Sequence, residues 1–171
     1  DSMLAAAREL DLTMGGPELA DNLGQTSRRR SLYFRTTPDN KMEMLGLFDL
    51  ANPNECYERR ESVMPQQSLA LLNSALALDL SRLLARKLAS EKKEAFAAAA
   101  FEWVLSRPPS KEEMILSLKF LQAQEAQLVR GGTPFAGANA AKVPAAKAPA
   151  QRARENLVQV LFNHNDFVTI R

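Results

Sequence analysis

Carboxylates, the only cysteine and several arginines gather in one stretch of the chain. Asp49, Glu55 and Glu61 lie close to Cys56 and Arg59 in the sequence. Paired carboxylates can carry out general acid–base chemistry or hold a hard cation, and a thiolate can act as a nucleophile. The spacing matches no recognised ligand loop, however, and charged connectors of this composition usually form ion pairs with their own arginines. We therefore expect an ion-paired connector, and these five residues are the candidates of a catalytic alternative.

The rest of the sequence offers little support for metal chemistry or thiol catalysis. A catalytic thiol needs a basic partner, and the only histidine, His164, lies far from Cys56 in the sequence. One cysteine and one histidine cannot provide a Cys/His zinc set. The chain has no CxxCH haem attachment motif, no glycine-rich phosphate loop and no G-x-S-x-G elbow. We predict no cofactor and no metal in this chain.

A basic and aromatic stretch has the composition of a nucleic-acid surface. It consists of Arg28-Arg29-Arg30 followed by Tyr33 and Phe34. The charges of the whole chain nearly cancel, however, because 22 lysines and arginines face 20 aspartates and glutamates. A net charge of +2 creates no field that would gather nucleic acid. We expect a solvated turn with packed aromatic side chains, and no nucleic-acid partner.

The elements around these residues are predicted to be helical. Apolar residues recur at helical spacing over 2–10, 40–48, 95–106 and 152–162. Asp39 is the expected N-cap of the helix over 40–48. Three further helices are predicted: one starts at Pro65, one runs from a cap at Ser74 to about 90, and one starts at Lys111. Ser110 and Glu113 form an S-x-x-E capping box, so the helices on either side of Pro108-Pro109 should form a hairpin. The predicted fold class is mainly α, an irregular helical bundle of about six helices with one short extended segment, Ser31 to Thr36.

Composition divides the chain into three parts. Residues 131–150 are mainly alanine, glycine, proline and lysine, with too little large apolar surface to offset the entropy of ordering them. We predict a helical domain over 1–130 that is the C-terminal part of a larger domain, a flexible linker over 131–150, and a C-terminal helix over 151–171 that packs back on the bundle. The longest strongly apolar run, 95–101, is far shorter than the roughly 20 residues of a membrane span, so none is predicted.

Five blocks follow one another along the chain: DSMLAAARELDLTMGGP, RRSLYF, FDLANPNECYERRESVMPQQSLALLNS, FEWVLSRPPSKEEM and ENLVQVLFNHNDFV. Together they resemble the C-terminal part of a planctomycete-specific domain of unknown function. The resemblance implies fusion to planctomycete cytochrome c-type domains and export to the periplasm or cell surface, and it implies no established reaction. Ala75 departs from the family pattern, which often has proline after Asn-Ser.

We expect a non-catalytic helical module for structure or interaction within a larger exported protein. Its partners would be the N-terminal remainder of the same polypeptide and a cytochrome c-type domain of the parent protein. Apolar surface on the first helix and around Leu32 to Phe34 would form the contact. Two alternatives stay open. One is part of a hydrolytic or redox enzyme whose site the N-terminal portion completes, and the other is a cell-surface polysaccharide-binding module that uses Tyr33, Tyr57 and Trp103.

Overall fold

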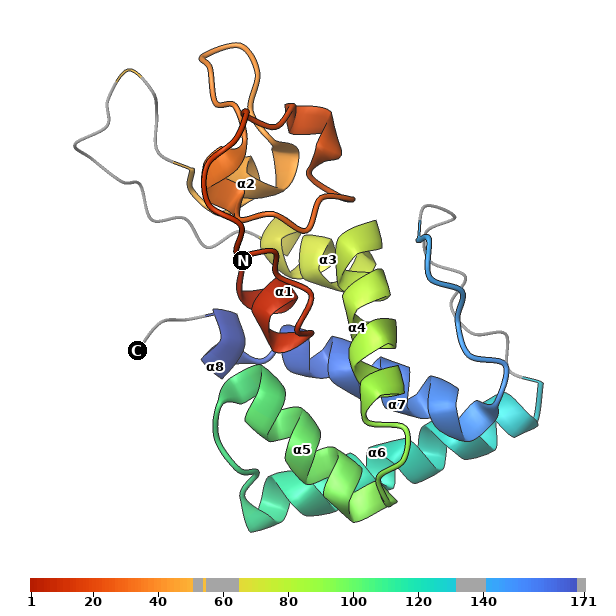
Figure 1. Cartoon of the computed structure of the whole chain (residues 1–171). Coiled ribbons are helices and arrows are strands. Elements are labelled where there is room, and N and C mark those ends of the chain that lie inside the picture. Colours follow the sequence, from red (N-terminus) through yellow and green to blue (C-terminus); the bar gives the residue numbers. More distant parts are fainter. Residues whose placement is uncertain (51–53, 55–64, 132–140, 169–171) are drawn as a thin grey trace.

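The computed structural model describes residues 1–50, 54, 65–131 and 141–168 (Figure 1). Within these residues the chain forms α-helices and two short 3-10 helices, and no β-strand. The α-helices are α1 (Ser2–Ala6), α2 (Glu43–Leu47), α3 (Pro65–Asn73), α4 (Ala75–Lys87), α5 (Lys93–Leu105), α6 (Lys111–Val129), α7 (Pro149–Phe162) and α8 (Asn165–Val168); the 3-10 helices are η1 (Asp21–Leu23) and η2 (Ser31–Tyr33). The prediction of a mainly helical, irregular bundle is confirmed.

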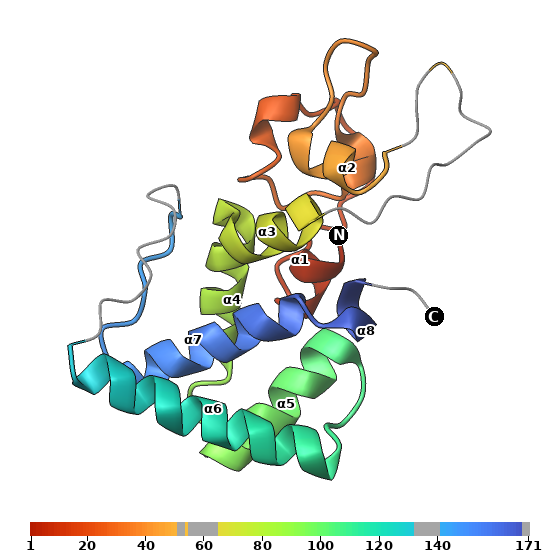
Figure 2. The same ribbon diagram turned by 180° about the vertical axis from the view of Figure 1, so that it is seen from behind.

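Helix α7 lies at the centre of the bundle. It contacts α3, α4, α5, α6 and α8, and Figure 2 shows it crossing α4 and running alongside α6. Its buried face includes Val158 and Phe162. These side chains belong to one apolar core with Leu80 and Leu84 of α4 and Phe96 of α5. Helix α7 therefore supplies part of the core that the earlier helices share.

A serine separates α3 from α4. The Ser74 hydroxyl accepts a hydrogen bond from the Ala77 N–H at 3.2 Å, so it caps α4 as the sequence predicts. In α3 the Leu71 side chain is buried, whereas the Leu69 side chain is 55% exposed. Leucines occur on more than one side of α3, so the contacts with α4 and α7 decide which side is buried.

No single helix in the described part of the chain is long and apolar enough to cross a membrane. Helices α3 and α4 reach that length and apolar character only when taken together, and the chain bends by 52° between them.

Helices α5 and α6 form the predicted hairpin. After α5 ends at Leu105, Ser106 adopts a left-handed φ of 56° and the chain turns through two prolines. The Ser110 hydroxyl then accepts from the Glu113 N–H at 3.2 Å, and the Glu113 carboxylate accepts from the Ser110 N–H at 2.7 Å. The capping box predicted from the S-x-x-E spacing is therefore confirmed.

The first helix is shorter than its periodicity predicts. Helix α1 ends at Ala6, whereas the predicted range extends to residue 10. The difference arises at Arg8, which takes a left-handed φ of 53° and so cannot continue the helix. The Glu9 N–H donates to the Leu4 carbonyl at 2.8 Å, the bond that closes a Schellman motif.

The end of α1 is fixed to two other helices. The Arg8 guanidinium stacks on Trp103 of α5, 3.8 Å from the ring centroid. The Lys87 ammonium of α4 donates to the Ala7 carbonyl at 2.9 Å and pairs with the Glu9 carboxylate at 2.7 Å. These contacts hold the N-terminal segment against the bundle.

The segment predicted to be extended, Ser31 to Thr36, begins with a turn and is extended only from Phe34. Residues Ser31–Tyr33 form η2, and only Phe34 makes an isolated parallel bridge, to Leu19. The Phe34 N–H donates to the Ser31 carbonyl at 3.1 Å, which closes the turn. A short apolar run between basic residues cannot by itself distinguish these two conformations.

The predicted N-cap of the next helix is also wrong. The Asn40 N–H donates to the Thr37 hydroxyl at 3.0 Å, so residues 37–40 form a turn. The predicted helix would have begun at residue 40, within this turn. Helix α2 begins only at Glu43, and the Met42 thioether in the N-cap position accepts from the Leu45 N–H at 3.3 Å. Asp39 therefore does not cap α2.

Part of the predicted linker is held against the bundle. Helix α7 begins at Pro149, inside the range 131–150. Before it, the Asp79 carboxylate of α4 accepts hydrogen bonds from the backbone N–H groups of Lys142 and Val143, at 3.2 and 2.8 Å. Composition alone cannot show that carboxylates elsewhere in the fold satisfy this backbone. Residues 132–140 lie outside the described chain, and the predicted domain boundaries stay a prediction.

Candidate functional site

An apolar pocket of about 370 Å³ lies where both ends of the described chain meet. Side chains of α1, α2, α3, α4 and α8 form its wall, together with the segment from Gly24 to Phe34. The apolar lining residues are Met3, Leu4, Phe34, Met42, Met44, Leu45, Phe48, Leu71, Leu76, Phe167 and Val168. Its volume is at the small end of the range for ligand pockets, and its wall suits apolar side chains or a small apolar molecule.

The two charged residues of the pocket wall, Asp1 and Arg29, make internal contacts. Asp1 accepts a hydrogen bond from the Ser31 N–H at 2.7 Å. The Arg29 guanidinium stacks on Tyr33 at 3.8 Å, and it donates to the carbonyl of Pro17 at 3.3 Å and to that of Gly15. These groups shape the wall, and they do not present a pair of free acid and base groups.

A glycine allows two segments to approach at the pocket wall. A Cβ atom on Gly24 would lie 2.4 Å from Met42 Cε and 2.6 Å from Met42 Cγ, so a larger residue would force the Met42 side chain to move. Gly24, Met42 and Met44 also line a neighbouring cavity of about 200 Å³. Methionine side chains adapt their shape readily, so the wall between the two cavities can repack around an occupant.

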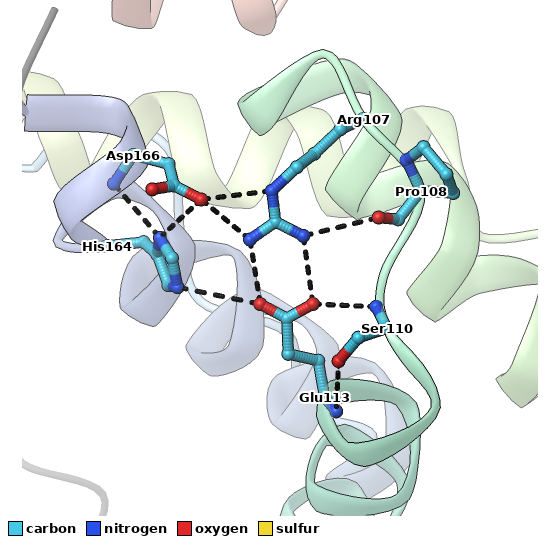
Figure 3. A network of polar contacts seen from close by, with 6 residues as sticks. All are labelled: Arg107, Pro108, Ser110, Glu113, His164 and Asp166. Carbon is cyan, nitrogen blue, oxygen red and sulfur yellow. Dashed lines mark hydrogen bonds and ion pairs between the residues drawn. The ribbon is translucent and has the colours of Figure 1, made fainter. Parts of the chain in front are cut away.

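An arginine between two carboxylates joins the α5–α6 turn to α8 (Figure 3). The two Nη atoms of Arg107 donate to the Glu113 carboxylate at 2.8 and 2.7 Å. Its Nε and Nη2 atoms donate to Asp166 Oδ2 at 2.9 and 2.7 Å. A bidentate arginine–carboxylate pair fixes geometry as well as charge, so this cluster clamps the C-terminal residues to the hairpin.

The only histidine of the chain borders this clamp. His164 Nδ1 accepts the Asp166 N–H at 3.1 Å, and Nε2 lies 3.8 Å from Glu113 Oε1. Because Nδ1 accepts a hydrogen bond, the neutral ring carries its proton on Nε2, the atom that faces Glu113.

The electrostatics of the clamp favour a structural role. Hydrogen bonds from Arg107 lower the pKa of Glu113 from 4.5 to about 2, and the two carboxylates raise the pKa of Arg107. A carboxylate with so low a pKa is a poor proton acceptor near neutral pH. Across the described residues, no group of three His, Cys, Asp or Glu side chains is placed to hold a metal ion.

Of the five residues of the catalytic alternative, the structure describes only Asp49. Glu55, Cys56, Arg59 and Glu61 lie outside the described residues, so their expected ion pairs stay a prediction.

Asp49 has a conformational role at the end of α2. It adopts a left-handed φ of 55°, a region that aspartate and asparagine enter more readily than most residues. The following N–H, of Leu50, donates to the Leu45 carbonyl at 3.1 Å, as in a Schellman motif. The backbone gives Asp49 this conformational role, and its catalytic role stays a prediction.

The arginines of the basic stretch and Arg35 contact other residues in the N-terminal part of the chain. Besides the bonds of Arg29, Arg30 Nε lies 3.9 Å from the Asp1 carboxylate, and Arg35 Nε donates to Glu18 at 2.8 Å. These contacts use positive charge that a nucleic acid would otherwise meet. The absence of a nucleic-acid partner stays a prediction.

Only one local pattern in the sequence points to the clamp. The S-x-x-E spacing locates Glu113 beside Ser110, but Arg107 and Asp166 are 59 residues apart and no local pattern links them. The pocket has no sequence signature either, because its wall is assembled from elements at both ends of the described chain.

These features define a helical domain with an apolar pocket and an arginine-centred clamp, without a recognisable reaction centre among its described residues. Residues 1–121 match the family described as PSD1, protein of unknown function (DUF1553), and the chain belongs to this family. Comparison with curated proteins and with solved structures gave no match. The matched range ends within α6, so α7 lies beyond it.

Proposed function

We propose that this chain is a non-catalytic interaction module of a larger exported protein. The apolar pocket carries the proposal, and we infer that it receives apolar side chains from the N-terminal remainder of the same polypeptide. Three of its lining residues, Met3, Met42 and Met44, have adaptable side chains, which suits a polypeptide partner that must repack on contact. Val168, on the pocket wall, remains 40% exposed.

Apolar surface next to the pocket supports the same role. Leu32 is 59% exposed and belongs to the segment that lines the pocket, as expected from the sequence. Met3 and Leu4 of α1 face the pocket, and exposed apolar side chains follow this helix at Leu12 and Met14. An apolar pocket with an exposed apolar side chain in the same segment, here Leu32, is typical of contact surfaces.

Export to the periplasm or cell surface belongs to the same proposal, as does a cytochrome c-type domain as a further partner. Both rest on the resemblance to the planctomycete domain. The sequence upstream in the same reading frame tests them, because a signal peptide would support export and a CxxCH motif would support the haem-binding partner. An upstream sequence with neither feature would remove this part of the proposal.

A cleavage experiment tests the pocket as the docking site. The parent protein is cut near Asp1, and the association of the two pieces is measured by size-exclusion chromatography and calorimetry. We expect the pieces to stay together, and Val168→Lys to weaken their association at least about tenfold, or ~1.4 kcal/mol, by placing a charge at the pocket. The control is Leu116→Lys, at a position on α6 that is 65% exposed and away from the pocket lining. Free separation of the wild-type pieces without detergent or salt would contradict the proposal.

The alternatives gain no support of their own from the described residues. Two of the three aromatic residues proposed for polysaccharide binding are covered by arginines, Trp103 by Arg8 and Tyr33 by Arg29. The third, Tyr57, lies outside the described residues. The carboxylates of the clamp are committed to Arg107, as shown above.

A further inference from the structure

Residues 141–148, here called the strap, lie over a row of four charged side chains, three of which are buried. In Figure 1 the strap is the blue segment that leads into α7. The row, here called the cradle, consists of Asp79, Arg82 and Arg86 of α4 and Glu155 of α7. Three of these side chains are almost inaccessible, since Asp79 is 5%, Arg82 7% and Glu155 2% exposed.

The cradle binds the strap through its main chain. Asp79 accepts two successive N–H groups, as described above, and Arg82 Nη1 donates to the Val143 carbonyl at 2.5 Å. Arg86 donates to the Pro144 carbonyl. Glu155 accepts the Ala146 N–H with both oxygens, at 3.1 and 3.2 Å.

The strap buries little of its own surface. None of its residues is buried, and Lys142, Pro144 and Lys147 are exposed. Opening the strap would therefore expose mainly charged groups of the cradle, which gain hydration when water reaches them. A segment with few buried apolar contacts belongs to the low-stability end of a fold, so we expect the strap to open before the helices unfold.

We propose that the cradle is a receptor for an extended polypeptide main chain, and that the strap occupies it in cis. The partner would be an extended segment of another polypeptide with small side chains. Its contacts need two successive N–H donors, then a position that uses only its carbonyl and so admits proline, as Pro144 does here. Opening of the strap makes the cradle available to such a segment.

Amide hydrogen exchange tests whether the strap opens by itself. We expect the amides of Lys142, Val143 and Ala146 to exchange at least about 100-fold faster than the slowest amides of α4 and α7. Exchange of all these amides at one rate would mean that the strap opens only when the whole chain unfolds, and it would overturn the proposal.

Substitution of Asp79 tests the cradle. Asp79→Asn keeps the shape of the side chain, but its amide nitrogen would face one of the two N–H donors, so strap amides should exchange about tenfold or more faster. The matched control is Glu125→Gln, which removes the charge from a carboxylate that is 33% exposed and paired with Lys93 at 2.6 Å. Equal strap exchange in both variants would overturn the role of Asp79.

A peptide tests binding in trans. Val143→Pro in the full chain removes one donor to Asp79 and loosens the strap; Ala146→Pro is the second variant if the first does not fold. A peptide of residues 141–148 is added at about 1 mM, the effective concentration that a short tether supplies. We expect the peptide to shift the NMR signals of the α4 amides around Asp79. In a variant that also carries Asp79→Asn, the peptide should cause no such shifts. Absence of shifts in the loosened variant would overturn the proposal.

Discussion

At the residue level, Glu113 makes the stability of the protein depend on pH. Its pKa is about 2 in the folded chain and near 4.5 for an ordinary glutamate, so the folded state favours the ionised form. The stabilisation is therefore present above pH 4.5 and is lost as the pH falls toward 2. We expect the free energy of unfolding, measured by urea titration, to decline across this interval.

Two glutamine variants check this assignment. Glu113→Gln should remove the part of the decline that this carboxylate causes, because glutamine does not titrate. Glu112→Gln, one residue earlier in the same helical turn and exposed, should retain the full decline. If both variants follow the wild-type curve, the ion pair with Arg107 does not contribute measurably to stability.

Gly24 gives a second prediction at the residue level. Gly24→Ala would place a methyl group against Met42, so we expect a loss of about 1–3 kcal/mol from forced repacking. Gly46→Ala is the control, because its Cβ meets no atom within 4 Å and alanine favours helix α2 by about 0.5–1 kcal/mol. Chemical denaturation of both variants should show opposite signs. A stable Gly24→Ala would show that the Met42 side chain moves aside without cost.

At the level of elements, the Ser74 hydroxyl caps the start of α4. Ser74→Ala removes the acceptor for the Ala77 N–H, so we expect a loss of about 1 kcal/mol in unfolding free energy. Ser90→Ala, at an exposed position after α4, should change stability little. A loss equally large at Ser90 would show that the effect is not capping.

Elements with local signals could be predicted from the sequence. The capping box at Ser110 and the cap at Ser74 both depend on residues within one helical turn, and both are present. The prediction failed where a local pattern has two solutions. Asp39 is a good N-cap residue, but the turn closed by Thr37 and Asn40 comes first. The run around Leu32 fits a strand, yet Ser31–Tyr33 form a turn, and the Ser31 N–H donates to the Asp1 carboxylate.

At the scale of the whole molecule, the core includes residues beyond the range that matches the family. The matched residues 1–121 exclude α7, whose Val158 and Phe162 lie in the same core as Leu80 and Phe96. A chain of residues 1–121 would leave that core open on one side. We expect it to show no cooperative thermal unfolding, unlike the whole chain, as followed by circular dichroism. A cooperative transition in the shorter chain would show that α7 is dispensable.

The candidate sites belong to this largest scale, which is why the sequence did not reveal them. The pocket, the clamp and the cradle each join residues from distant parts of the chain, such as Arg107 with Asp166 and Asp79 with Val143. Periodicity and caps predict the helices that carry these residues. Which helix faces meet depends on long-range packing, and local sequence patterns do not predict those contacts.

The stacking of Arg8 on Trp103 provides a built-in optical probe. Trp103 is the only tryptophan of the chain, and the cation above its ring comes from the segment just after α1. Its emission therefore reports whether the N-terminal segment is seated on α5, independently of the signal from the helices themselves. Without any added label, a fluorescence titration can follow detachment of that segment as the partner piece binds or as the chain unfolds.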